Sequence, residues 1–116
     1  MTVTQQLQRL SKSKFRRSQR LSRKLLTYAK KQGIDTLEKH TRDLLSKRLF
    51  VAYPFKDGKQ TPYKGHPVFL AQHGTATCCR SCLSKWYDIP KGKPISAADQ
   101  EMIISLIRGW LCKRIN

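Results

Sequence analysis

The sequence predicts an all-α protein, a single compact domain of about five helices with a basic N-terminal helical segment and a long central loop. Apolar residues recur at helical spacing in several stretches, and capping residues stand where most of these stretches begin. A chain of 116 residues fills one core without splitting into separate units. Only "FVAYPF", residues 50–55, fits a short strand as an alternative.

The first predicted element is a basic amphipathic helix that ends at Gly33. Leu21, Leu25 and Tyr28 recur at i, i+4 and i+7. Basic residues fill much of the rest of the turn: Arg16, Arg17, Arg20, Arg23, Lys24, Lys30 and Lys31. On one helix, those at 16, 20 and 24 are like charges four residues apart, which costs helix stability unless an anion is bound. Within the domain of residues 1–116 we therefore distinguish a basic segment, 1–33, from a helical core, 34–116.

The second predicted helix begins at Asp35 and ends before residue 54. Asp35 and Glu38 form a D-x-x-E pattern that can cap the free amides of the first turn. The apolar positions of this helix are Leu37, Leu44, Leu45 and Leu49.

The long central loop follows, because "FKDGKQTPYKG" at residues 55–65 is rich in Gly, Pro and Lys and has no period. We expect residues 57–66 to be exposed and to lie beside a helix that starts near Thr75. Lys59 and Lys64 then approach a phosphate together with backbone amides. A plain connector is the alternative interpretation.

Three further helices are predicted in the second half of the chain. Pro67 fits the first position of a short helix that ends at Gly74. Thr75 or Thr77 caps the next helix, which carries three cysteines. The last helix begins at Ser96, with a capping box, and its buried stripe is Met102, Ile103, Leu106, Ile107, Trp110 and Leu111.

The strongest functional signal is a net charge of +17, from 24 Lys and Arg against 7 Asp and Glu. Positive side chains in such excess repel one another in the folded protein, and a bound polyanion relieves this repulsion. Binding also releases the counterions that were condensed on the polyanion, which favours the complex. We therefore predict a protein that binds the phosphates of DNA or RNA. The predicted contacts are Lys12, Lys14, Arg16, Arg17, Arg20, Arg23, Lys24, Lys30 and Lys31, with Lys59 and Lys64 from the loop.

Residues 65–86, the Cys/His window, contain two of the three histidines and three of the four cysteines. His73, Cys78 and Cys82 form the most compact set of zinc ligands, with His66 or Cys79 as the fourth. Ordinary core packing is the competing interpretation, because Cys79 falls on the apolar stripe of its helix and a free Cys packs as a small hydrophobe. A third interpretation is a catalytic thiol at Cys78, near a helix N-terminus.

The string "GKQTPYKGHPVFLAQHGTATCCRSCLSKWYDIPKGKPI", together with "SKSKF" near the start, resembles a small family of bacterial proteins known as a domain of unknown function. The resemblance covers most of the chain. It implies a bacterial or phage source, a cytoplasmic single-domain protein, and a signature made of His66, His73, Cys78, Cys79, Cys82 and Trp86. After the signature Trp the family has His, whereas this chain has Tyr87, which argues against a metal ligand at that position.

Two other classes of function stay open. One is a small enzyme of nucleic-acid or phosphorylated-substrate metabolism that uses the Cys/His window, and the other is a basic protein-interaction module. The seven carboxylates form no evident pair, which argues against a nuclease of the carboxylate type. No apolar run is long enough to span a bilayer, so we expect a cytoplasmic protein with reduced thiols and no membrane partner.

Overall fold

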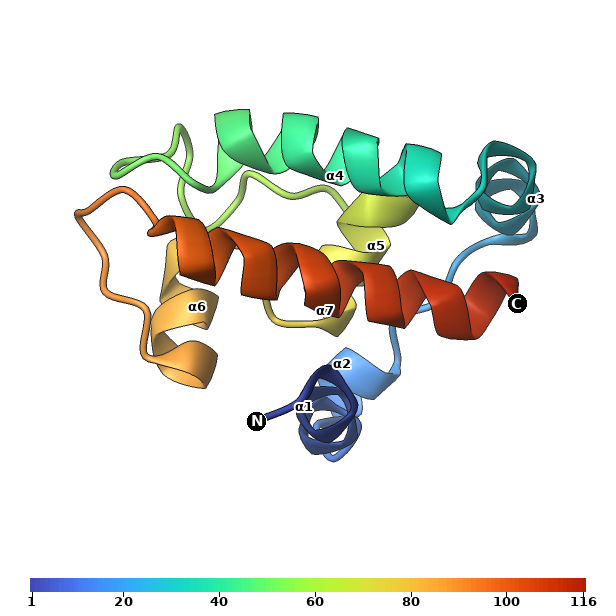
Figure 1. Cartoon of the computed structure of the whole chain (residues 1–116), viewed down its shortest axis with the longest axis horizontal. Helices are drawn as coiled ribbons and strands as arrows, with labels where there is room; N and C mark the ends of the chain where they lie inside the picture. Colours follow the sequence, from blue (N-terminus) through green and yellow to red (C-terminus); the bar gives the residue numbers. More distant parts are fainter.

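The computed structural model describes residues 1–116 and contains seven helices and no strand, so the all-α prediction is confirmed (Figure 1). The helices are α1 (Val3–Leu10), α2 (Lys14–Arg17), α3 (Arg23–Gln32), α4 (Ile34–Arg48), α5 (Pro67–Gly74), α6 (Arg80–Tyr87) and α7 (Ala97–Ile115). The strand considered for residues 50–55 does not form. The helix count exceeds five because the basic segment, 1–33, divides into three helices.

The predicted helix end at Gly33 is confirmed, because Gly33 is the C-cap of α3, but the expectation of one continuous basic helix is wrong, because serines start new helices within this segment. Ser13 caps α2 and Ser22 caps α3, each with a side-chain oxygen that accepts a backbone N–H. Arg20 lies between the two helices. Arg16, Arg20 and Lys24 therefore do not lie four apart on one helix, and the repulsion expected from that arrangement is absent.

The predicted capping pattern of the second helix is also wrong. α4 begins at Ile34, and Gly33, with φ of +83°, precedes it without any side-chain cap. The carboxylates of Asp35 and Glu38 instead accept hydrogen bonds from Arg108 of α7, each at 3.0 Å. These acids join two helices.

α6 begins later than predicted, since Cys79 and neither threonine is its N-cap. The threonines belong to the turn between α5 and α6, where Ala76 has φ of +58°. Gln72 of α5 donates to the carbonyl of Thr77 at 2.9 Å, and Thr75 donates to the carbonyl of Ala71 at 2.8 Å. This buried turn fixes where the cysteines lie relative to α5.

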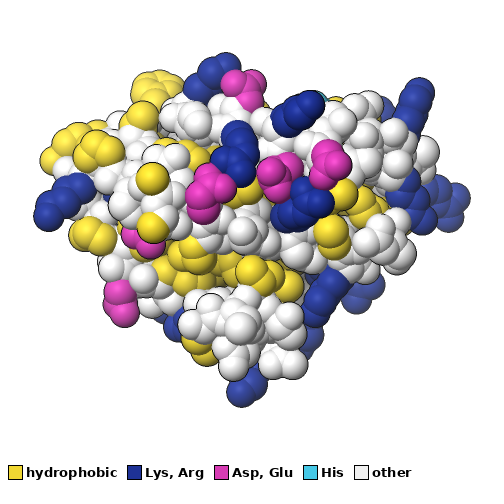
Figure 2. Space-filling model, in the orientation of Figure 1, with side chains coloured by type: hydrophobic (Ala, Val, Ile, Leu, Met, Phe, Trp, Pro, Cys, Tyr) yellow, Lys and Arg dark blue, Asp and Glu magenta, His cyan; other side chains and the backbone are white.

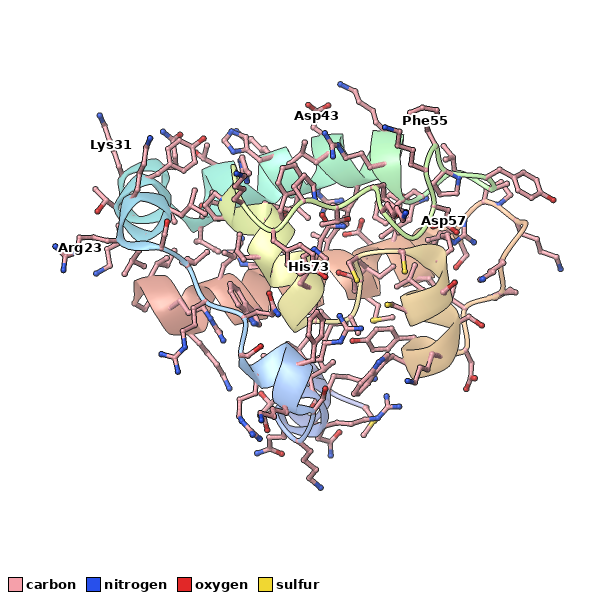
Figure 3. The ribbon with its side chains drawn as sticks, turned by 180° about the vertical axis from the view of Figure 1, so that it is seen from behind. Arg23, Lys31, Asp43, Phe55, Asp57 and His73 are labelled. Atoms are coloured by element: carbon pink, nitrogen blue, oxygen red, sulfur yellow. The ribbon has the colours of Figure 1, made fainter.

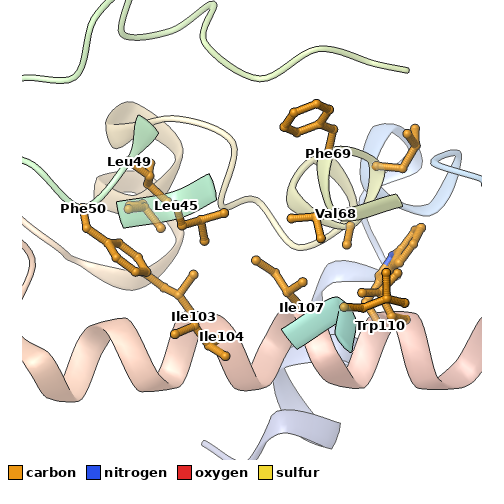
Figure 4. Packing of buried hydrophobic residues seen from close by; sticks show 14 of the residues in the cluster. Leu45, Leu49, Phe50, Val68, Phe69, Ile103, Ile104, Ile107 and Trp110 are labelled. Carbon is orange, nitrogen blue, oxygen red and sulfur yellow. The ribbon is translucent and has the colours of Figure 1, made fainter. Parts of the chain in front are cut away.

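α7 is the central helix of the fold, and it contacts α1, α3, α4 and α5 (Figure 1). Its predicted stripe is buried except for Met102, which is half-buried, and Ile104 is buried as well. Figure 4 shows this face of α7 packed against residues of α4 and α5. Two glycines allow close approach, since a Cβ on Gly74 would lie 2.7 Å from Cε2 of Trp110 and one on Gly109 would lie 2.8 Å from Cγ1 of Val3.

Charges of opposite sign are unevenly distributed over the surface. Five of the seven acids lie on α4 and α7: Asp35, Glu38, Asp43, Asp99 and Glu101. Figure 2 shows acidic side chains over these two helices and Lys and Arg gathered toward the right and lower edges. No helix is both long and apolar enough to cross a membrane.

Candidate functional site

Three sulfur atoms meet at the N-terminus of α6 and form the cysteine cluster, defined as Cys78, Cys79 and Cys82. Their Sγ atoms lie within 4.8 Å of one another, and those of Cys78 and Cys82 are 3.5 Å apart. The cap of α6 holds them in place, because Sγ of Cys79 accepts the backbone N–H of Cys82 at 3.4 Å. A tetrahedral ion with Zn–S bonds of about 2.3 Å separates its sulfur ligands by about 3.8 Å. The cysteine cluster can therefore hold a metal ion.

Arg16 points at this cluster. Its guanidinium donates to Sγ of Cys82 at 3.2 Å, to Sγ of Cys78 at 3.6 Å and to the carbonyl of His73 at 2.8 Å. Hydrogen bonds from Cys78 and Cys79, followed by those from Arg16, lower the pKa of Cys82. The pKa of Cys78 is raised, because its thiol donates to the neighbouring sulfurs and is buried. The guanidinium of Arg16 is nearer to the sulfur of Cys82 than to that of Cys78, so its charge favours a thiolate at Cys82.

His73 lies next to the cluster but outside the group of atoms within 4.8 Å (Figure 3). Its ring stacks on Tyr63 at 3.8 Å, and its Nε2 lies 2.9 Å from the carbonyl oxygen of Thr61. Since a carbonyl only accepts, Nε2 carries the proton, and Nδ1 of the neutral ring keeps a free lone pair. That Nδ1 is buried and has no hydrogen-bond partner. Burial also lowers the pKa of His73, which favours the neutral ring.

His66, considered as a fourth ligand, lies at the other end of α5 and caps it. Its Nδ1 accepts the backbone N–H of Val68 at 3.1 Å, and its Nε2 lies 3.1 Å from Nδ1 of His40. With Nδ1 accepting, the proton of the neutral ring is on Nε2, which leaves no lone pair for a metal. Burial and the neighbouring His40 lower the pKa of His66 to about 4.

The loop of residues 57–66 lies beside α6, as predicted, but it is only partly exposed. Gln60 and Thr61 are buried, and Thr61 donates to the carbonyl of Cys78 at 2.7 Å. Oδ1 of Asp57 accepts the first backbone N–H of α6, from Arg80, at 3.1 Å. The loop thus helps to build the site, while its lysines at 59 and 64 are exposed.

A second feature is a groove between the N-terminal segment and the C-terminal end of α7, which we call the basic groove. Two adjoining hollows form it, and no carboxylate lines either of them. The basic side chains along it are Arg16, Arg17, Arg20, Lys113 and Arg114. Arg114 stacks on Trp110, with its guanidinium carbon 3.5 Å from the ring centre. Burial and the positive charge of Arg20 lower the pKa of Arg114.

The structure thus distributes the predicted phosphate contacts over several places. Arg17 and Arg20 line the basic groove, and Arg16 borders it while bonding the sulfurs. The rest are exposed: Lys12, Lys14, Arg23, Lys24, Lys30 and Lys31 on or next to α2 and α3, and Lys59 and Lys64 in the loop between α4 and α5. Lys113 and Arg114 were not predicted, because cations in the last turn of a helix are ordinary there.

A family model described as "Domain of unknown function (DUF4186)" matches residues 4–112 of the chain. No solved structure matches it significantly.

Proposed function

The chain belongs to the DUF4186 family, a domain of unknown function, and we propose that it binds nucleic acid through the phosphate backbone. The observation that carries this proposal is the basic groove, in which five Lys and Arg side chains meet with no carboxylate among them. Unbalanced cations in a concave surface concentrate positive potential there, and a polyanion is the ligand that such a surface attracts.

The chemistry of the groove suits phosphate. Arg17 and Arg20 present guanidinium groups, which bind phosphate oxygens in pairs, and Lys113 adds a point charge. Arg20 and Arg114 repel each other across the groove, and a bound phosphate removes that cost. α2 and α3 each contribute a lining residue to the groove, Arg17 and Leu26, and the other exposed cations of these helices would extend the positive surface along a longer strand.

Titration of labelled duplex DNA, single-stranded DNA and RNA at several salt concentrations tests this proposal. Log affinity for the duplex should fall linearly with log salt, at a slope of about −0.9 per phosphate contact. The double variant Arg20→Glu/Lys113→Glu should bind every sequence at least about tenfold more weakly and give a flatter slope, because backbone contacts carry no sequence information.

The matched control is Lys39→Glu/Lys85→Glu, which changes the net charge equally at exposed positions outside the groove. Its affinity should stay much closer to that of the unmodified protein. Equal losses in the two variants would show that total charge matters and the groove does not. No binding to any nucleic acid at low salt would contradict the proposal as a whole.

We also propose that the cysteine cluster holds Zn²⁺, with His73 as the fourth donor. The unpartnered Nδ1 of His73 supports this, because a metal-bound imidazole usually donates its other N–H to a carbonyl or carboxylate, as His73 does to Thr61. Three thiolates and one imidazole around Zn²⁺ leave a charge of −1, and Arg16 offsets it. A site closed by four protein ligands is a structural one, which favours a binding domain over an enzyme.

Metal analysis of protein prepared without a histidine tag tests the zinc site. The unmodified chain should contain one zinc per molecule, and Cys78→Ser or Cys82→Ser should lose it. Cys112→Ser is the control, since this thiol lies on α7 outside the cluster. A zinc-free protein that unfolds at the same temperature with and without added zinc would refute the assignment.

A further inference from the structure

Two aromatic side chains in the loop between α4 and α5 project into solvent. Tyr53 and Phe55 are each 83% exposed, on either side of the buried Pro54. Phe55 lies at the upper edge of the view in Figure 3, above Asp57. The two rings are close in the chain, and both have a face that a ligand can reach.

The backbone next to these rings is held by buried hydrogen bonds. Arg80, which is 1% exposed, donates to the carbonyl of Val51 on one loop and to those of Pro90 and Lys93 on another, the last two at 2.8 and 2.7 Å. A backbone hydrogen bond of 3.0 Å from Ile95 to the carbonyl of Phe50 joins the same two loops. Arg80 thus clamps the two loops together beside the rings, which reduces the backbone ordering that binding at this place requires.

Positive charge surrounds the rings. The hollow beside Phe55 is lined by Lys47, Arg48, Lys56 and Lys59. Nζ of Lys56 lies 5.5 Å from the centre of the Phe55 ring. The hydroxyl of Tyr53 lies against Gly92, between two exposed lysines at 91 and 93.

The only carboxylate of this loop, Asp57, is already engaged, because its Oδ1 accepts from Gln60 and from the backbone of Arg80. Its single negative charge remains, but it offsets only one of the four lysines at 56, 59, 91 and 93. We call Tyr53, Phe55, Lys56, Lys59, Lys91 and Lys93 the aromatic platform.

We propose that the aromatic platform binds unpaired bases of single-stranded nucleic acid, which stack on Tyr53 and Phe55 while the lysines contact the adjoining phosphates. This inference rests on the proposed nucleic-acid binding and names its substrate class. Stacking needs a free base face, which a strand offers and a duplex hides, and it tolerates any sequence because every base has a π face. Lysines that alternate with aromatic rings on the protein match the alternation of phosphates and bases along a single strand.

Fluorescence anisotropy with a labelled single strand, as DNA and as RNA, and with the matching duplex tests the platform. Tyr53→Ala and Phe55→Ala should each weaken single-strand binding about fivefold or more. Duplex affinity should change less than twofold. The exchange variant Tyr53→Phe/Phe55→Tyr keeps both rings and should retain single-strand affinity.

Because both rings are exposed, these variants should unfold at the same denaturant concentration as the unmodified protein, and this is measured alongside. Unchanged single-strand affinity in Tyr53→Ala/Phe55→Ala, with weaker binding in Arg20→Glu/Lys113→Glu, would overturn the platform and leave the proposed function standing. Absence of all nucleic-acid binding would overturn both. Binding to anionic lipid vesicles that needs the two rings, with single strands unaffected by their loss, would reassign the platform to a membrane surface and also overturn the inference.

Discussion

Replacing Arg80 by Met should destabilise the protein and release the two loops that it joins. Methionine keeps most of the aliphatic volume of the side chain but removes every donor. The guanidinium donates three hydrogen bonds, to the carbonyls of Val51, Pro90 and Lys93, from a residue that is 1% exposed. The variant therefore leaves three carbonyl groups without their donor.

The size of the effect follows from two opposing contributions. Three hydrogen bonds from a charged donor stabilise by about 5 to 9 kcal/mol in total. Against this, Met removes the cost of burying a charge, which amounts to several kcal/mol, and carbonyls of exposed loop residues regain water. The net loss in the free energy of unfolding should be about 2 to 4 kcal/mol.

Urea denaturation measures this loss, with Arg108→Met as the control, since Arg108 makes exposed ion pairs and its replacement should hardly move the midpoint. Amide hydrogen exchange gives a second readout, because the N–H of Ile95, bonded to Phe50, should exchange faster. A loss below about 1 kcal/mol with unchanged exchange at Ile95 would refute the role of Arg80 as a clamp.

Two further outcomes follow from single contacts. Gly74→Ala should lower the free energy of unfolding by about 1 to 3 kcal/mol, because its Cβ overlaps the ring of Trp110; an unchanged urea midpoint would contradict this. The pKa of His66 is lowered to about 4, below its unfolded value of about 6.5, so protonation favours the unfolded chain and stability is lost as pH falls between these values. Because His66 is partly exposed, this loss of stability should be limited to about 1 to 2 kcal/mol. The variant His66→Asn can still cap α5 but does not titrate. Its stability should therefore differ less between pH 7 and pH 4.5 than that of the unmodified protein, which urea denaturation at both pH values measures.

The helices that the sequence predicts well have local signals at both ends or a wide apolar stripe. α5 begins at Pro67 and ends at Gly74, and α7 is capped by Ser96, all as expected. The helix boundaries within the basic segment, 1–33, are poorly predicted, because the many Lys and Arg residues fit a helix on either side of each boundary. Ser13 and Ser22 are the only local marks of them, and serine also occurs inside helices.

In the candidate site, too, features that depend on local spacing are predictable and features that depend on distant contacts are not. The sequence groups Cys78 and Cys82 as candidate ligands, and their sulfurs lie 3.5 Å apart, although Cys78 precedes α6 and does not lie on it. Cys79 is predicted either as a core residue or as a fourth ligand, and it is buried and also belongs to the cluster; its role as N-cap was not predictable, because it depends on the buried turn before α6. The inward direction of Arg16 and the clamp formed by Arg80 depend on contacts between separate segments of the chain. Local sequence patterns do not predict such contacts.

The basic groove contains no carboxylate, whereas most acids on α4 and α7 are paired with Arg42, Lys47 or Arg108 of the same helices. The positive potential is therefore uneven over the surface, and near the long polyanion of the proposed function this asymmetry would turn the groove toward the strand before contact. At low ionic strength of about 0.01 M the field extends over about 30 Å, comparable with the 37 Å length of the molecule. Orientation is then selected during the approach, and fewer encounters end with the wrong face against the strand.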